Sequence, residues 1–198
     1  MNPTITFTGA RGGHGTTTVA AAVAIHAART RPTTLVSPDT PAATALLGLP
    51  GGAEPAPIDV LPTLTVAADM PETSTDHGIV VDAGTLAARS AGGPGGDRNY
   101  LVLRGPCYIA LASVLAAGVT GFDGVVIVAE AQRSLTAADV ADVLGLPVVA
   151  TVNASPQVAR TIDAGLLLSR LTRLNDLASL RSLTDLHPAC RPPSTSPR

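Results

Sequence analysis

The chain has 198 residues, enough for one sizeable hydrophobic core and too few for two ordinary domains with linkers. Hydrophobic residues make up 45% of the sequence and charged residues 14%, a balance typical of a parallel α/β sheet covered on both faces. The formal net charge of −2 and the aromatic content of 2% argue against a nucleic-acid-binding surface, which needs basic patches and rings that stack on bases.

The two cysteines, Cys107 and Cys190, lie in an apolar segment and in a Pro-rich tail, so we expect no structural disulfide and a reducing, cytoplasmic compartment. The uncharged stretch 105–122 approaches the length of a membrane span, but glycines and a proline interrupt it. We expect it to contain a helix covered by the rest of a soluble fold, with no membrane contact.

Short apolar runs alternate with helical patterns along the chain. The predicted strands, rich in β-branched residues, are 4–8, 33–37, 64–67, 78–82, 100–104, 124–129 and 147–152. The predicted helices are 16–29, 41–47, 107–117, 136–145, 156–171 and 175–186. Gly and Pro mark 51–57 as a linker and 92–97 as a loop, and 64–67 is a candidate edge strand.

This alternation predicts a single α/β domain over residues 1–186, doubly wound, with a mostly parallel sheet and helices on both faces. A disordered Pro-rich tail, 187–198, is expected to follow. Ligands of such sheets bind at the carboxyl ends of the strands. The loops expected at that rim follow Thr8, Ser37, Asp82, Arg104 and Val152.

The first of these loops reads GARGGHGTTT over residues 9–18. Gly12, Gly13 and Gly15 leave the backbone N–H groups unobstructed, and the N-terminus of the next helix adds partial positive charge. The stretch therefore predicts a cradle for phosphate groups. The alternative is a tight turn between strand and helix whose glycines serve packing alone.

The common phosphate-loop pattern, G-x-x-x-x-G-K-[ST], is incomplete here. Ala10 stands in place of the first glycine and Thr16 in place of the lysine, whereas Thr17 keeps the hydroxyl that ligates magnesium. The missing lysine removes a charge that helps to bind and transfer the terminal phosphates.

Residues 11–18, RGGHGTTT, resemble the K-G-G-x-G-K-[ST]-T loop of the ParA/MinD family of deviant P-loop ATPases. In that family the first lysine reaches the partner's phosphates across a nucleotide-sandwich dimer. Arg11 occupies that first position here and preserves the charge, whereas Thr16 occupies the second lysine position and does not.

Later segments extend the resemblance over most of residues 4–171. Ser37 and Asp39 match the two acid positions of the family's D-x-D switch, the first without an acid. Asp82 ends a stretch that resembles the Walker B strand, where it would hold magnesium through water. Residues 148–164 resemble the late strand, the loop beside the base and the helix after it. One strand–helix unit is expected to be missing before that strand, which would make the chain a reduced member.

The resemblance implies a P-loop NTPase fold of the SIMIBI/MinD type that binds ATP and Mg²⁺. It implies a nucleotide-dependent switch or positioning factor, with weak or no hydrolysis, that forms a homodimer or contacts a protein partner. Residues implied to bind the nucleotide are Arg11, Gly12, Gly13, His14, Gly15, Thr16, Thr17, Thr18, Asn153 and Pro156. Thr17 and Asp82 are implied for the metal and Asp39 for catalysis.

Two alternatives stay open beside this reading. The first is a pseudo-ATPase scaffold that binds no nucleotide, for which Thr16 is the best evidence. The second is a small enzyme acting on a phosphorylated metabolite. His14 is expected to fill the loop rather than to catalyse, because no Ser or Cys nucleophile with a partner acid is visible.

Leucines recur at every third position from 168 to 186. A step of three does not hold one face of a 3.6-residue helix, so the stripe is expected to wind around it. Asp176 and Asp185 interrupt the arginines of this region, which argues against a membrane-surface helix. We expect these leucines to cover the core or to form a dimer contact.

Overall fold

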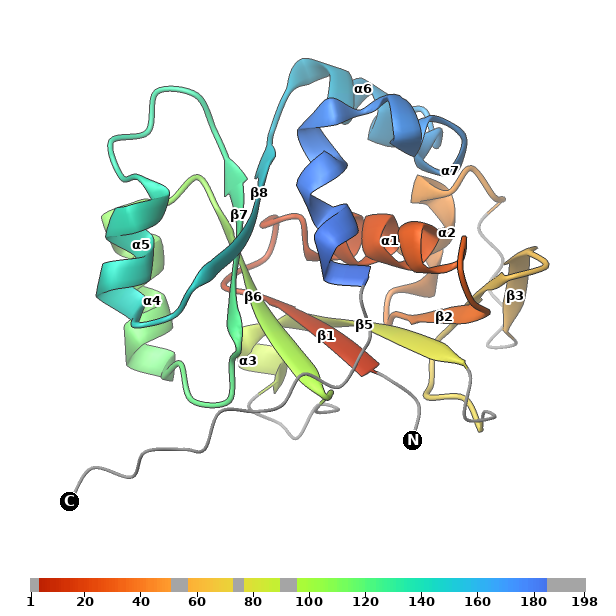
Figure 1. The fold of residues 1–198 in the computed structure, drawn as a ribbon, viewed down its shortest axis with the longest axis horizontal. Coiled ribbons are helices and arrows are strands. Elements are labelled where there is room, and N and C mark those ends of the chain that lie inside the picture. The colour runs from red at the N-terminus through yellow and green to blue at the C-terminus, as the bar shows by residue number, and fades with distance from the viewer. Residues whose placement is uncertain (1–3, 51–56, 73–76, 90–95, 185–198) are drawn as a thin grey trace.

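The computed structural model describes residues 4–50, 57–72, 77–89 and 96–184, which form one twisted sheet between two layers of helices (Figure 1). The expected tail, 187–198, lies outside the described residues. So do most of the expected linker at 51–57 and of the expected loop at 92–97.

Within the described residues the sheet has eight strands in the order β3-β4-β2-β5-β1-β6-β7-β8. The strands are β1 Thr4–Gly9, β2 Thr33–Val36, β3 Ile58–Leu61, β4 Leu64–Ala67, β5 Gly78–Thr85, β6 Arg98–Arg104, β7 Gly124–Ala129 and β8 Val148–Asn153. All neighbouring strands are parallel except β3 and β4. The chain extends the sheet first to one side of β1 and then to the other, which confirms the predicted doubly wound, mostly parallel sheet.

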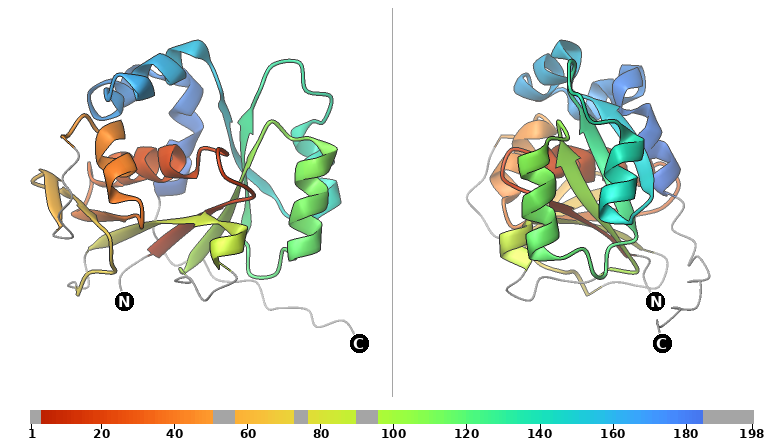
Figure 2. Two further views of the ribbon diagram at one scale, coloured as in Figure 1. Left: turned by 180° about the vertical axis from the view of Figure 1, so that it is seen from behind. Right: turned by 90° about the vertical axis from the view of Figure 1, so that its left-hand side faces the viewer.

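The helices cover both faces of the sheet, as predicted (Figures 1 and 2). They are α1 Thr16–Ala27, α2 Thr40–Leu46, α3 Leu86–Arg89, α4 Tyr108–Ala117, α5 Ala137–Leu144, α6 Pro156–Asp163 and α7 Leu167–Arg170, with 3₁₀ segments η1 Leu171–Arg173 and η2 Asn175–Thr184. Residues of α1, α2, α6, α7 and η2 share one buried cluster with the sheet, and residues of α3, α4 and α5 share another.

Alternation along β6 and β7 divides their side chains between these two clusters. In β6, Tyr100 and Val102 face the α1 side, whereas Leu101 and Leu103 face the α4 side. Successive side chains of a strand point to opposite faces, so a strand covered on both sides must be apolar throughout. This burial explains the continuous apolar runs from which these strands were predicted.

The edge of the sheet differs from the prediction. Leu64–Ala67 was the candidate edge strand, but β3 pairs with it and forms the edge instead. Side chains of β3 alternate between half-buried and exposed, and its antiparallel pairing is irregular between Asp59 and Leu61. A strand of only four residues, interrupted by Asp59 and half exposed, carries little of the continuous apolar signal by which buried strands are recognised.

The helix predicted over 156–171 is broken. It ends at Asp163, and α7 starts at Leu167 after Gly165, which has a φ of 63°. A Cβ on Gly165 would lie 2.9 Å from the carbonyl oxygen of Ala45 and 3.0 Å from Cα of Gly48. The break therefore lets the chain turn tightly against the end of α2.

The leucine stripe does not wind around its helix. Residues Asn175–Thr184 form a 3₁₀ helix, whose three residues per turn place every third side chain on one face. Leu171, Leu174, Leu177, Leu180 and Leu183 are all at most 4% exposed and join the cluster on the α1 side. The period of three was real evidence for this helix type, and the expected role in covering the core is confirmed.

Helix α4, predicted to be covered, buries only one face. Ala110, Leu111 and Val114 pack on the sheet, but Tyr108 is 83% and Ile109 67% exposed. No helix in the described part of the chain combines the length and hydropathy needed to cross a membrane.

Candidate functional site

The loop between β1 and α1 is built on glycines. Gly13 and Gly15 have φ angles of 79° and 84°, a backbone region that costs other residues about 1–2 kcal/mol. Gly9, where β1 ends, faces the Thr16 hydroxyl, and any side chain there would collide with it. Arg11, Gly12 and Gly13 are exposed at the tip of the loop.

Helix α1 begins without a side-chain cap. Its N-cap residue is Gly15, which offers no side-chain hydrogen bond to the first turn. By contrast, Asp39, Thr136 and Ser155 cap α2, α5 and α6 through hydrogen bonds of 3.1–3.2 Å. The first-turn N–H groups of α1 therefore stay available, and the helix dipole adds partial positive charge to them.

Asp82 lies beside the start of α1 in the middle of β5, not at its end as predicted. Its side chain is 3% exposed. Oδ2 accepts hydrogen bonds from the hydroxyls of Thr17 at 2.6 Å and Ser37 at 3.3 Å, and Oδ1 accepts the N–H of Gly84 at 3.0 Å. The structure thus joins two residues predicted for a metal, together with the serine at the first switch position.

These groups suit magnesium. Mg²⁺ keeps several of its waters and binds proteins through one or two carboxylates or hydroxyls plus substrate phosphates. Asp82, Thr17 and Ser37 supply one carboxylate and two hydroxyls next to the loop. Among the residues that the structure describes, no group of three or more His, Cys, Asp or Glu side chains could hold a metal by itself.

Thr16 fills the position of the missing lysine without replacing its charge. It is 7% exposed, and its hydroxyl packs against Gly9 at the end of β1. Thr18, two residues on, lies half-buried where α1 borders a cleft. The formally charged side chains near this loop are therefore arginines, which add to the partial charge of the helix start.

His14 is tied to the neighbouring strand. Its Nδ1 accepts a hydrogen bond of 3.3 Å from the main-chain N–H of Arg104. Burial, and then the charges of Arg11 and Arg104, lower the pKa of His14, so the ring is neutral near pH 7. These contacts fit the expectation that His14 fills the loop.

The sequence did not single out Arg104 as a ligand-binding residue. It is the last residue of β6, and its Nη1 donates to the carbonyl oxygen of Gly13 at 3.3 Å while its Nε donates to Glu130 at 2.9 Å. A strand-terminal arginine resembles an ordinary solvated residue in sequence. Its expected place at the rim of the sheet was the one available signal.

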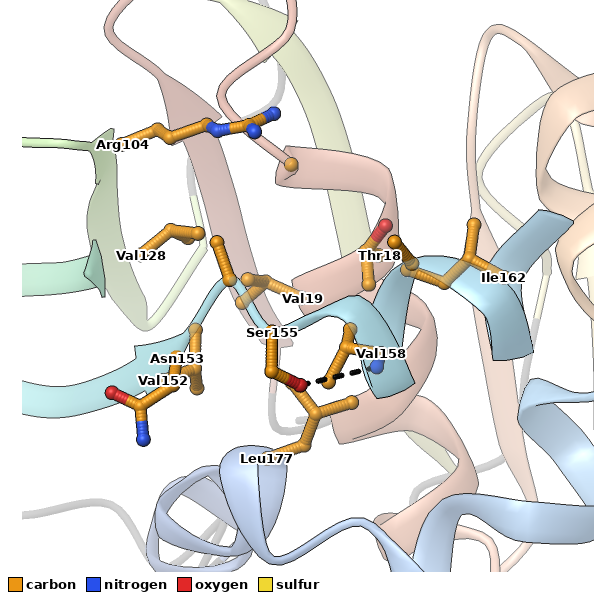
Figure 3. A pocket seen from close by; sticks show the side chains of 13 residues that line it. Thr18, Val19, Arg104, Val128, Val152, Asn153, Ser155, Val158, Ile162 and Leu177 are labelled. Carbon is orange, nitrogen blue, oxygen red and sulfur yellow. Dashed lines mark hydrogen bonds between the residues drawn. The ribbon is translucent and has the colours of Figure 1, made fainter. Parts of the chain in front are cut away.

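A cleft of about 150 Å³ opens beside the loop (Figure 3). Gly15, Thr18 and Val19 of the α1 end form one wall, and the ends of β6, β7 and β8 with α6 and η2 complete it. Pockets that enclose a whole small molecule measure about 300–1,000 Å³. This cleft can therefore enclose only part of such a molecule.

Two residues near the end of β8, Asn153 and Pro156, were predicted to bind the nucleotide, but only Asn153 lines the cleft. The Asn153 amide donates to Asp176 of η2 at 3.1 Å. The Ser155 hydroxyl donates to the same carboxylate at 2.6 Å, and these two contacts lower the pKa of Asp176, with Ser155 the larger cause. Pro156, the first residue of α6, is exposed and is not part of the cleft lining.

Asp39 is the N-cap residue of α2. Its carboxylate accepts the N–H of Ala42 at 3.1 Å and so caps α2, while the side chain remains exposed. An N-cap of this kind contributes about 1 kcal/mol to helix stability. The cap leaves one face of the carboxylate open to solvent.

No protein-family model and no curated protein matches the chain. Solved structures do. A ParA family ATPase from Chlorobium tepidum TLS is 14% identical with a TM-score of 0.67, and the match covers 94% of this chain and 100% of that one. The septum site-determining protein MinD with Mg-ADP, from Pyrococcus horikoshii OT3, is 16% identical with a TM-score of 0.72, covering 93% and 96%.

A McdA–ATP complex from Cyanothece is 14% identical with a TM-score of 0.61, covering 92% of this chain and 95% of that one. These likenesses establish that the chain has the α/β fold of the ParA/MinD ATPases. The three matches span 95–100% of those chains.

Proposed function

We propose that the chain binds ATP with Mg²⁺ at the loop before α1 and acts as a nucleotide-dependent switch or positioning factor. The observation that carries this proposal is the hydrogen bond from Thr17 to Asp82, made beside an uncapped helix N-terminus. The MinD structure with Mg-ADP and the McdA structure with ATP share the fold and support the choice of ligand.

Each part of the site has a separate task in this proposal. Main-chain N–H groups of Gly12, Gly13, Gly15 and Thr16 face the phosphates, because the glycines leave them unobstructed. Thr17 and Asp82 hold the metal, the latter through water, and the metal neutralises phosphate charge. Arg11, exposed at the loop tip, contacts phosphate in its own chain or across a homodimer.

The cleft next to the loop is the place for the nucleoside. Its lining is mainly apolar, and its polar residues are Thr18, Arg104, Asn153 and Ser155. An apolar slot with few polar groups suits the faces of a base. Pro156 contributes by starting α6 behind the cleft rather than by direct contact.

Hydrolysis is weak or absent in this proposal. The lysine that stabilises the transferring phosphate is replaced by the uncharged, buried Thr16. Loss of such a charge removes several kcal/mol of transition-state stabilisation, and each 1.36 kcal/mol is about tenfold in rate. Asp39 is the proposed switch carboxylate, since its cap on α2 leaves it accessible.

A second candidate is a scaffold that has kept the fold and lost the nucleotide. The burial of Thr16 against Gly9 favours it, because that packing fills space near the loop with the protein's own atoms. In that case the fold would serve contact with a protein partner alone.

Thermal melting separates these candidates. If ATP with Mg²⁺ binds, ligand at one hundred times Kd should raise Tm by about 5 °C or more. The rise should disappear when EDTA removes the metal. No rise with ATP or GTP favours the scaffold, and a rise with sugar phosphates alone indicates a small enzyme acting on phosphorylated metabolites.

A further inference from the structure

Arg104 lies where the loop before α1 meets the end of β6. Figure 3 shows its side chain reaching from that strand toward the start of α1, above the cleft. Its main-chain N–H donates to Nδ1 of His14 and its Nη1 donates to the carbonyl oxygen of Gly13, both at 3.3 Å. The residue thus touches the phosphate loop through both its backbone and its guanidinium group.

Glu130 fixes the direction of this guanidinium. It accepts Nε of Arg104 at 2.9 Å and also pairs with Arg133. Hydrogen bonds from Arg133 and Arg104 hold the pKa of Glu130 below its usual value, so it is ionised at neutral pH. Two guanidinium groups then share one carboxylate, and that of Arg104 also contacts the loop.

The chain is shaped to make room for this cluster. Gly105, the residue after Arg104, has a φ of 47°, and a side chain there would collide with the Glu130 carboxylate. Its N–H donates to the carbonyl oxygen of Val128 at 2.8 Å and anchors the turn to β7. A glycine is needed at this position for the ion pair to form.

Three of the five N–H donors of Arg104 take no part in these contacts with Gly13 and Glu130. The side chain is 46% exposed, so a ligand on the loop can reach them. A guanidinium whose direction is already fixed loses little freedom when it binds phosphate oxygens, which it can contact in pairs.

We propose that Arg104 supplies, from β6 and within the same chain, the phosphate-binding positive charge that Thr16 does not provide. This inference rests on the proposed function, because it assigns one more residue to the same nucleotide site. The ligand it recognises is the polyphosphate of a nucleotide. Glu130 acts as a positioning residue, since it holds Arg104 without touching the ligand.

The test is calorimetry of the full chain with Mg-ATP and, separately, with adenosine, which has no phosphates. Arg104→Ala should weaken Mg-ATP binding about tenfold or more, the effect of losing a charge-assisted contact. It should weaken adenosine binding much less, because adenosine has no phosphates and Arg104 is one of several residues that line the cleft. Arg133→Ala is the matched control, because Arg133 shares Glu130 but makes no hydrogen bond or ion pair with the loop among the residues that the structure describes. Its effect should stay within about threefold.

The outcomes distinguish a failure of this inference from a failure of the proposed function. If the two arginine variants bind Mg-ATP equally well, or if Arg104→Ala weakens adenosine as much as Mg-ATP, the inference is wrong while the proposed function stands. If the unaltered chain does not bind Mg-ATP at any concentration, the proposed function is wrong and so is the inference. Melting curves of the unliganded variants show that each is folded.

Discussion

Oγ1 of Thr17 donates a hydrogen bond of 2.6 Å to Oδ2 of Asp82, although the two residues are 65 positions apart in the sequence. The contact joins the first turn of α1 to the interior of β5, next to the strand from which the loop departs. Ser37, at the end of β2, reaches the same oxygen at 3.3 Å. Three segments far apart in the sequence thus meet at one carboxylate.

Asp82→Asn should remove the metal dependence of nucleotide binding. The buried amide is close in size to the carboxylate and still accepts a hydrogen bond, so the variant should fold. It lacks the negative charge that attracts Mg²⁺. Melting with ATP should then give the same Tm with Mg²⁺ as with EDTA. Asp59→Asn, on the edge strand β3, is the control and should keep the full magnesium effect.

Thr16→Lys should tighten Mg-ATP binding by about tenfold or more, because it restores a charge that helps to bind the terminal phosphates. The lysine side chain has to leave the position of the Thr16 hydroxyl beside Gly9, so a small loss of stability is expected. Calorimetry measures the affinity and melting measures the stability. A variant that is less stable and binds no more tightly would show that the loop is not shaped for phosphates.

Most of the fold could be predicted because its strands are buried on both faces. Continuous apolar runs such as those of β5 and β6 are hard to mistake, and the glycine loop after β1 stands out by composition. The edge strand β3 was missed because half of its side chains are exposed. The helix break at Gly165 depends on a close contact with Gly48, and the sequence around Gly165 carries no sign of that distant contact.

The site was predictable where the resemblance covered both the loop before α1 and the strand that carries Asp82. Thr17 and Asp82 are hydrogen-bonded, and the uncapped N-terminus of α1 directly follows the glycine-rich loop, as predicted. Arg104 was missed because its importance comes from the neighbouring loop and from Glu130, 26 residues later. Pro156 was predicted in the same loop as Asn153 but does not line the cleft, since a shared loop does not fix which side chains line it.

Leu180→Ala should lower the free energy of unfolding by about 2–5 kcal/mol. Leu180 is 0% exposed and lies among the leucines that the 3₁₀ helix holds against α1 and the sheet. Leu115→Ala on α4, where the side chain is 49% exposed, should lower the free energy of unfolding by well under half of that amount. Denaturant unfolding compares them. Equal losses would mean that η2 does not cover the core in solution.

His26→Leu should reduce the loss of stability in acid. Burial, and then the charges of Arg29 and Arg181, lower the pKa of His26 below 6.5. The unfolded chain therefore binds a proton more readily, so stability is lost as pH falls below 6.5 through the folded-state pKa. Neither ring nitrogen has a hydrogen-bond partner in the described part of the chain, so leucine should be tolerated at neutral pH.

The measurement is the change in Tm between about pH 7.5 and about pH 5.5 for the chain and the variant. His14, whose pKa is also lowered, is present in both proteins and cancels in the comparison. An unchanged difference in Tm would show that His26 is as easily protonated in the folded state as in the unfolded chain.

The central claim, a nucleotide site formed by the loop, the start of α1 and Asp82, is tested most directly by titrating the full chain with Mg-ATP in a calorimeter. We expect saturable binding of one nucleotide per chain that is lost when Mg²⁺ is removed. No heat at ATP concentrations of about several millimolar, where even a Kd of about 1 mM would give a signal, would contradict it.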